Sequence, residues 1–184
     1  ENIDSNTNWN SALEGIDSVI HLAGRAHFLK KTSSNSSTEF KSINIDGTAN
    51  LANQAASAGV KRFLYLSSIK VNGEETFPGE PFKPDNEPSP VDEYGKSKLE
   101  AERQLINIST KTEMDFVIIR PVMVYGPGVK GRLLNLIKIS DTPAPLPFKG
   151  IASKFSAVFV GNLIQLINCI LKKNAKGVFI AKDK

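Results

Sequence analysis

The chain has 184 residues, the length of about one domain, and 40% of them are apolar, which is enough to form a core. Its net charge of +4 suits an anionic ligand such as a nucleotide phosphate, but the basic residues are scattered and not interleaved with aromatic ones, so nucleic acid is not the expected partner. No run of about 18 apolar residues indicates a membrane span, and we expect a cytoplasmic protein that binds no membrane.

The first predicted elements alternate between strands and helices. Residues 17–24 form a buried strand that runs into a turn of small residues, and residues 61–68 and 115–121 are further strands. Between the first two strands, residues 40–60 carry small and apolar side chains on one helical face, and Gly59 suits the C-cap of that helix. The alternation predicts an α/β fold with a parallel sheet and helical crossovers on both faces.

The rest of the chain continues the pattern after a long loop. Residues 76–92 contain five prolines and are predicted as a loop, after which a helix begins at about residue 92. Residues 132–139 are a candidate helix, and 156–160 and 176–182 are candidate strands. Ligands of such sheets bind beyond the carboxyl ends of the strands.

The single cysteine, Cys169, has no partner for an internal disulfide, which fits a reducing compartment. It lies in an apolar helical stretch, so we expect a buried, unreactive thiol. With one cysteine and two histidines, no metal-site spacing is present, and His21 is expected to be a core or hydrogen-bonded residue.

Tyr94 and Lys98 are four residues apart at the start of the helix after the loop, which puts them on one helical face. A free tyrosine has a pKa of about 10, and a nearby ammonium lowers that pKa by favouring the phenolate. The pair is therefore able to exchange a proton with a substrate hydroxyl. On its own, this spacing is common and also fits an exposed pair with no catalytic role.

Other residues add to the pair in a fixed order along the chain. Ser68 ends a predicted strand, Asn44 lies on the preceding helix, and "HLAG" ends the strand before that. Together with the surrounding residues from 17 to 128, this order and spacing resemble the extended short-chain dehydrogenase/reductase superfamily, in its NAD-dependent nucleotide-sugar epimerase/dehydratase branch. The stretches that carry the resemblance are "DSVIHLAG", "INIDGTANLANQAASAGVKRFLYLSSIKVNGE", "DEYGKSKLEAE" and "FVIIRPVMVYGPG".

The resemblance implies a Rossmann-type, doubly wound parallel sheet. Residues 1–128 would be a partial NAD(P)-binding domain, and residues 129–184 would start a substrate-binding lobe interleaved with the last strands of the sheet. The family opens with a glycine-rich turn, which these residues lack. We therefore expect an N-terminally truncated part of a longer enzyme, itself catalytically inactive.

The resemblance also implies a role for individual residues. Tyr94 would be the catalytic acid/base, Lys98 would hold the nicotinamide ribose and tune Tyr94, and Ser68 would bind the sugar hydroxyl and help to pass the proton. The cofactor would be NAD, with NADP as the alternative. Its implied contacts are Leu22, Ala23, Gly24, Asn44, Ser67, Tyr94, Lys98, Pro121 and Val122, and the implied substrate contacts are Ser68, Lys70, Met123 and Lys154. Structural readings stay open for Ser68 as a strand-end cap and for Asn44 as a helix-surface amide.

Three departures from the family bear on the reaction. Ile69 and Lys70 stand where the 4,6-dehydratases have an Asp-Glu pair, which removes the acid for water elimination. Met123 replaces an Asn of the galactose epimerases, and near the position of their diphosphate-binding Arg this chain has Phe155, with Lys154 as the nearest charge. "SSIKVNGE" and "RPVMVYGPGVKG" look closer to UDP-N-acetylhexosamine 4-epimerases and UDP-N-acetylquinovosamine dehydrogenases.

The predicted function is an NAD(P)-dependent 4-epimerase of a UDP-hexose or UDP-N-acetylhexosamine, acting by hydride transfer at C4. One alternative is a 4-keto reductase or dehydrogenase without epimerisation, and another is a non-catalytic NAD(P)-sensing module. Related enzymes pair through the helices that follow the positions of Asn44 and Tyr94, so a homodimer is expected.

Overall fold

The computed structural model describes residues 3–26, 36–129, 134–135, 138–139 and 155–183. The strands are β1 (Ser18–His21), β2 (Arg62–Leu66), β3 (Asp115–Pro121), β4 (Met123–Tyr125), β5 (Ala157–Phe159) and β6 (Gly177–Ala181). The helices are α1 (Asn10–Leu13), α2 (Ser36–Phe40), η1 (Lys41–Gly47), α3 (Thr48–Ser57), η2 (Ile69–Val71), α4 (Glu93–Ser109) and α6 (Val160–Lys172).

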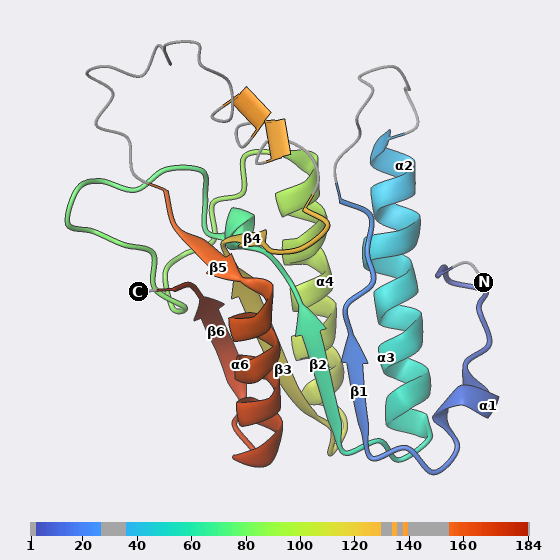
Figure 1. The fold of residues 1–184 in the computed structure, drawn as a ribbon. Coiled ribbons are helices and arrows are strands. Elements are labelled where there is room, and N and C mark those ends of the chain that lie inside the picture. Colours follow the sequence, from blue (N-terminus) through green and yellow to red (C-terminus); the bar gives the residue numbers. More distant parts are fainter. Residues whose placement is uncertain (1–2, 27–35, 130–133, 136–137, 140–154, 184) are drawn as a thin grey trace.

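Four of the described strands form a parallel sheet in the order β1-β2-β3-β6 (Figure 1). Each neighbouring pair is parallel, so the carboxyl ends of all four strands meet at one edge of the sheet. The strand predicted at 156–160 is confirmed as β5, but it pairs with β4 in a separate two-stranded sheet. β6 follows β5 in the chain and pairs with β3 in the main sheet. The division of the chain into two regions at residue 128 stays a prediction.

Helices cover both faces of the main sheet, as the alternating pattern predicts. Successive side chains of a strand point to opposite faces. On β2, Phe63 and Tyr65 pack in one core cluster with α3 and α4, whereas Leu64 packs in the other cluster with α6 (Figure 1). The doubly wound α/β architecture is therefore confirmed.

The predicted helix at 40–60 is present as a continuous run of α2, the π-helix η1 and α3. It ends as expected, because Gly59 has a φ of +81°, a conformation that favours glycine. The helix predicted after the proline-rich loop is α4, whose N-cap is Asp92. Of the candidate helix at 132–139, only 134–135 and 138–139 are described, and these are helical.

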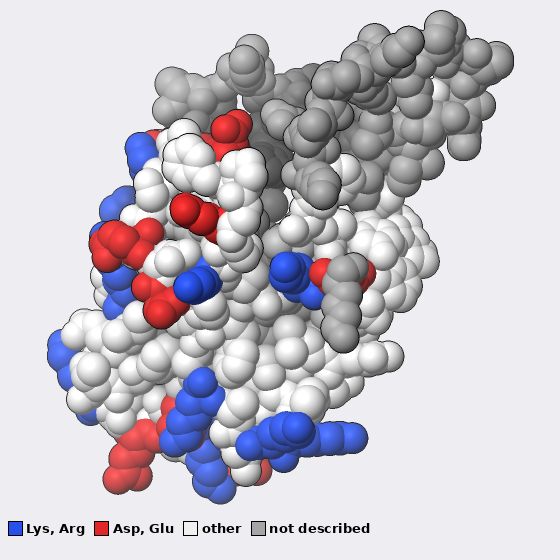
Figure 2. Space-filling model, turned by 90° about the vertical axis from the view of Figure 1, so that its left-hand side faces the viewer, with Lys and Arg blue, Asp and Glu red and all other residues white. Residues whose placement is uncertain are grey.

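The prediction of a buried Cys169 is wrong, because this residue is exposed. The inward face of α6 is formed by Leu163, Ile167 and Ile170, which recur at helical spacing, and Cys169 lies outside that stripe. Within the ranges given above, every helix is too short or too polar to cross a bilayer. On the face shown in Figure 2, basic and acidic side chains are interspersed, with uncharged surface between them.

Candidate active site

The candidate site lies at the carboxyl edge of the sheet, where the end of β2 meets the start of α4. Ser68 directly follows β2 and is the N-cap of η2, in which its Oγ accepts a hydrogen bond from the Lys70 N–H at 3.3 Å. Tyr94 lies in the first turn of α4, directly after the cap residue Asp92 and Glu93. The parallel topology therefore brings together two residues that the sequence separates by a long loop.

Tyr94 is half-buried, and its surroundings act on its phenol in opposite directions. Burial raises the pKa of Tyr94 above its ordinary 10.0, and the negative charge of Asp92 adds to this effect. A hydrogen bond with Ser68 and the positive charge of Lys70 lower the pKa. The expectation of a lowered Tyr94 pKa is wrong for this structure, because burial is the largest effect; Lys70 is one cation that favours the phenolate.

Lys98 is one turn further along α4 and is almost completely buried, with 3% of its surface exposed. Its Nζ donates a hydrogen bond to the Leu66 carbonyl at 2.9 Å and lies 4.4 Å from the ring centroid of Tyr65. The centroid of the Tyr94 ring is 6.0 Å away. Burial lowers the pKa of Lys98 to about 8, against the opposing effect of Glu102. The Lys98 ammonium is therefore closer to the end of β2 than to the ring of Tyr94.

Asn44 is buried and fixes the loop that follows β1. Its Oδ1 accepts a hydrogen bond from the Arg25 N–H at 2.7 Å, and its Nδ2 donates to the Arg25 carbonyl and to Ser97 Oγ, both at 3.0 Å. The reading of Asn44 as a helix-surface amide is therefore wrong. Its amide therefore connects the loop after β1 to α4, because it binds the backbone of Arg25 in that loop and the hydroxyl of Ser97 on α4.

The loop after β1 offers an open surface next to Lys98. Leu22, Ala23 and Gly24 are exposed, and a Cβ atom added at Gly24 would lie 3.2 Å from both Asn44 Oδ1 and Lys98 Nζ. An ammonium has three donors, and the Leu66 carbonyl occupies one of them. A glycine backbone beside a buried cation with donors to spare fits the ribose and nicotinamide part of a dinucleotide.

The other predicted contact residues lie in different surroundings. Ser67 is buried, and its hydroxyl donates to Glu102 Oε1 at 2.5 Å, so its side chain is used inside the protein. Pro121 is buried at the end of β3, and Val122 packs against the core cluster under α6. Met123 is exposed on β4. Lys154 lies outside the described residues.

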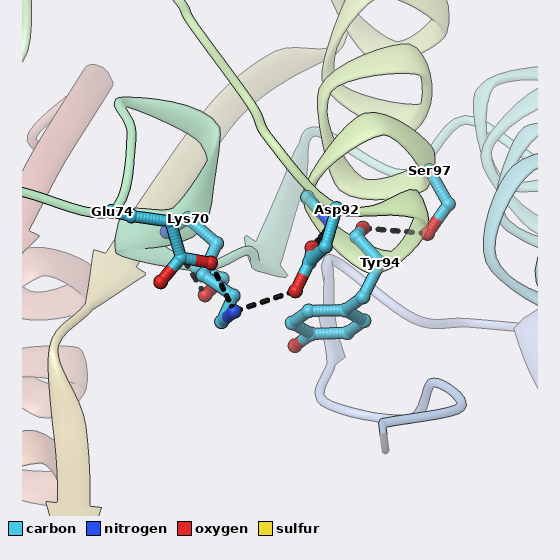
Figure 3. A network of polar contacts seen from close by, with 7 residues as sticks. Lys70, Glu74, Asp92, Tyr94 and Ser97 are labelled. Atoms are coloured by element: carbon cyan, nitrogen blue, oxygen red, sulfur yellow. Dashed lines mark hydrogen bonds and ion pairs between the residues drawn. The ribbon is translucent and has the colours of Figure 1, made fainter. Parts of the chain in front are cut away.

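Two groups of ion pairs at this site have no counterpart in the expectations from sequence, in which Lys70 is only an implied substrate contact. Lys70 Nζ lies 2.5 Å from Asp92 Oδ2 and 2.6 Å from Glu74 Oε1 (Figure 3). Deeper in the protein, Arg120 Nη2 lies 2.6 Å from Glu102 Oε2. An Asp directly before a helix is a recognised N-cap signal, which identifies Asp92, but the ion pairs have no local signal.

The model of the "NAD dependent epimerase/dehydratase family" matches residues 2–179. The chain is 44% identical to a UDP-glucose 4-epimerase of Vibrio cholerae over 184 residues, which are 98% of this chain and 56% of that protein. It is 31% identical over 175 residues to the N-acetyl-α-D-glucosaminyl-diphospho-ditrans,octacis-undecaprenol 4-epimerase of Escherichia coli O157:H7, covering 90% of this chain and 49% of that protein.

Solved structures show the same fold. The UDP-glucuronic acid 4-epimerase of Bacillus cereus in complex with NAD superimposes with a TM-score of 0.83 at 24% identity, over 100% of this chain and 59% of that one. MoeE5 in complex with UDP-glucose and NAD gives a TM-score of 0.80 at 23% identity, over 98% of this chain and 60% of that one. The chain spans about half the length of the curated relatives it matches.

Proposed function

Because the chain belongs to the NAD dependent epimerase/dehydratase family, we propose that it carries the catalytic residues of an NAD-dependent 4-epimerase of a UDP-hexose or UDP-N-acetylhexosamine. The observation that carries this proposal is the junction of β2 and α4, where Ser68 lies near enough to Tyr94 to lower its pKa. Buried Lys98 lies one turn beyond Tyr94, beside Gly24. The identity of 44% to a UDP-glucose 4-epimerase supports the same reaction.

The proposed chemistry assigns one task to each residue. Tyr94, as its phenolate, accepts the proton of the sugar C4 hydroxyl, and Ser68 orients that hydroxyl by hydrogen bonding to it. Lys98, whose Nζ already donates to the Leu66 carbonyl, would donate its other hydrogen bonds to the nicotinamide ribose. NAD, when bound, supplies the acceptor and donor for the hydride at the sugar C4. After the 4-keto sugar has turned its other face toward the nicotinamide site, Tyr94 returns the proton to the C4 oxygen.

Loss of water from the sugar is not part of the proposed reaction. Elimination needs a paired acid and base, and the positions after Ser68 hold Ile69 and Lys70. The Lys70 ammonium is already engaged by Asp92 and Glu74. A mouse dTDP-D-glucose 4,6-dehydratase is 33% identical over 115 residues, so this distinction rests on the residues and not on overall similarity.

The test is an assay of the full-length protein with NAD and either UDP-glucose or UDP-N-acetylglucosamine, followed by NMR of the products. We expect the C4 epimer, without net change in the NADH absorbance. Stoichiometric use of NADH would instead identify a reductase or dehydrogenase, and NAD binding without turnover would identify a sensing module. Accumulation of a 4-keto-6-deoxy sugar would refute the exclusion of dehydration.

A homodimer and a cytoplasmic location belong to the same proposal. A groove between η1 and α4, lined in part by Phe40, Ile45, Leu99 and Arg103, is a surface on which a second copy would pack. Light scattering of the full-length protein across a concentration series tests the dimer, and a monomer at all concentrations would contradict it.

A further inference from the structure

One carboxylate joins the two segments that carry Ser68 and Tyr94. Asp92 Oδ1 accepts a hydrogen bond from the Gly95 N–H at 2.7 Å and so caps α4 beside Tyr94, while Oδ2 of the same carboxylate lies 2.5 Å from Lys70 Nζ (Figure 3). We propose that Lys70 is a positioning residue for Tyr94, which ties the Ser68 segment to the start of α4 through Asp92 and keeps a positive charge near the phenol. This inference rests on the proposed function only in so far as Tyr94 is the acid/base.

A second contact between the same segments explains why Lys70 is fixed in place. A Cβ atom added at Gly95 would lie 2.8 Å from the Lys70 carbonyl oxygen, so the backbone of η2 packs directly against the first turn of α4. Glu74 Oε1 holds the Lys70 ammonium from the other side at 2.6 Å. Lys70 is therefore held through its backbone and through two carboxylates, which leaves its charge in a defined position.

The charges around Tyr94 give this arrangement an electrostatic consequence. The charged and titratable groups near its phenol, among the described residues, are Lys70 from η2, Asp92 at the helix start, Lys98 from the next turn and Tyr65 from β2. Lys70 lowers the pKa of Tyr94 and Asp92 raises it. The two members of one ion pair thus act on the phenol with opposite sign, so a charge effect is distinguishable from a purely structural one.

The experiment titrates Tyr94 directly, with the full-length protein labelled with ¹³Cζ-tyrosine and the Tyr94 resonance assigned through Tyr94→Phe. Lys70→Met removes a cation that favours the phenolate, so we expect the Tyr94 pKa to rise by roughly half a unit to one unit. Asp92→Asn keeps an oxygen to cap Gly95 and removes the negative charge, while Glu74 still holds Lys70, so the pKa is expected to fall. Lys70→Arg keeps the charge and is expected to restore most of the wild-type value.

Turnover gives a second readout at pH 7. A rise of half a unit to one unit lowers the phenolate fraction about 3- to 10-fold, and kcat of Lys70→Met is expected to fall by a similar factor. KM for the nucleotide sugar is expected to change less, because the Lys70 ammonium is engaged by two carboxylates and not free for a substrate. A large rise in KM with unchanged kcat would make Lys70 a substrate contact and overturn the positioning role.

The matched control is Lys96→Met, which removes an exposed lysine from the turn of α4 that carries Tyr94. Lys96 pairs with Glu93 at 2.9 Å, and we expect its loss to leave the Tyr94 pKa and kcat unchanged. Shifts of the Tyr94 pKa in the same direction for Lys70→Met and Asp92→Asn, or in neither variant, would overturn the proposal. Failure of the wild-type protein to turn over any nucleotide sugar would refute the proposed function, whereas the titration would still decide the role of Lys70.

Discussion

Two polar clusters connect the end of β2 to α4, and they differ in burial. The outer cluster contains Lys70 and Asp92, whose side chains are 26% and 36% exposed. The inner cluster contains Glu102 and Arg120, which are 2% and 5% exposed and also bind Ser67 through Glu102. Asp92 and Glu102 are ten residues apart, which is roughly 15 Å along a helix.

The two clusters bracket Ser68 in the sequence and in space. Ser67 is tied to Glu102 in the middle of α4, and Lys70 is tied to Asp92 at its start. Both ties join Ser68 to the helix that carries Tyr94. Because buried ion pairs are costly to break and exposed ones contribute little to stability, the inner cluster is expected to maintain the fold and the outer one to tune the chemistry.

Removing the phenol oxygen beside the outer cluster gives the largest expected effect. Tyr94→Phe deletes the phenol oxygen, and we expect kcat of the full-length protein to fall by ~10²–10⁴, which is the usual contribution of a positioned acid/base. The fold and NAD affinity are expected to be nearly unchanged. Steady-state kinetics and calorimetric titration with NAD provide the two readouts, and a kcat close to wild type would remove Tyr94 from the mechanism.

Breaking the inner cluster on one side is expected to cost the most stability. Glu102→Leu leaves the guanidinium of Arg120 buried without its carboxylate partner, and the free energy of unfolding is expected to drop by about 3–5 kcal/mol. Urea unfolding followed by circular dichroism measures this loss. The matched control is the double variant Glu102→Leu/Arg120→Met, which removes both charges and should recover part of the stability. A double variant as unstable as the single one would contradict the role of the uncompensated charge.

Which of these features the sequence predicts depends on how local their cause is. The strands of the main sheet, β5 and the helix α4 follow from hydrophobic periodicity and from the prolines before α4, whereas β4 is not predicted. Gly59 ends α3 as expected from a glycine C-cap. The pair of Glu102 and Arg120 has no such signal, because its members are 18 residues apart and meet only when α4 packs on the sheet.

The direction of the Tyr94 pKa was also beyond sequence reasoning. The spacing of Tyr94 and Lys98 indicates a shared helical face, but it gives neither the burial of the phenol nor the turn of the Lys98 ammonium toward the Leu66 carbonyl. The effect of Lys70 depends on how η2 folds back on α4. Tertiary packing therefore decides how burial and the nearby charges act on the tyrosine.

His21 on β1, which stacks on Tyr65 of β2, tests another buried group. Burial lowers its pKa from 6.5 to about 4, and its Nε2 lies 3.0 Å from Thr48 Oγ1. Between these two pKa values, His21 is protonated in the unfolded chain but neutral in the folded protein. The free energy of unfolding is therefore highest above pH 6.5 and decreases as the pH falls toward 4. We expect a loss of about 2–3 kcal/mol over this window, and a flatter profile for His21→Gln in urea unfolding at several pH values. Parallel profiles for the two proteins would exclude His21 as the cause.

Gly95→Ala tests the backbone contact within the outer cluster. The new Cβ would approach the Lys70 carbonyl oxygen to 2.8 Å, and neither backbone segment is free to move away without disturbing Asp92 or Tyr94. We expect a loss of about 1–3 kcal/mol in the free energy of unfolding, as is typical of overpacking, together with a lower kcat. Activity and stability both at the wild-type level would show that η2 and α4 separate easily.

The smallest expected effect on stability comes from the ion pair of the outer cluster. Lys70→Met removes a partly exposed cation from two carboxylates, and such pairs contribute about 0–1 kcal/mol. We therefore expect a change of less than about 1 kcal/mol in urea unfolding, although the same variant is expected to shift the Tyr94 pKa and lower kcat. A loss of several kcal/mol would place Lys70 with Glu102 and Arg120 as part of the structural support, and the contrast between the two clusters would disappear. A small loss of stability with a clear shift of the Tyr94 pKa would show that the two ion pairs of α4 have different roles. The inner pair would stabilise the fold because it is shielded from water, and the outer pair would act on Tyr94.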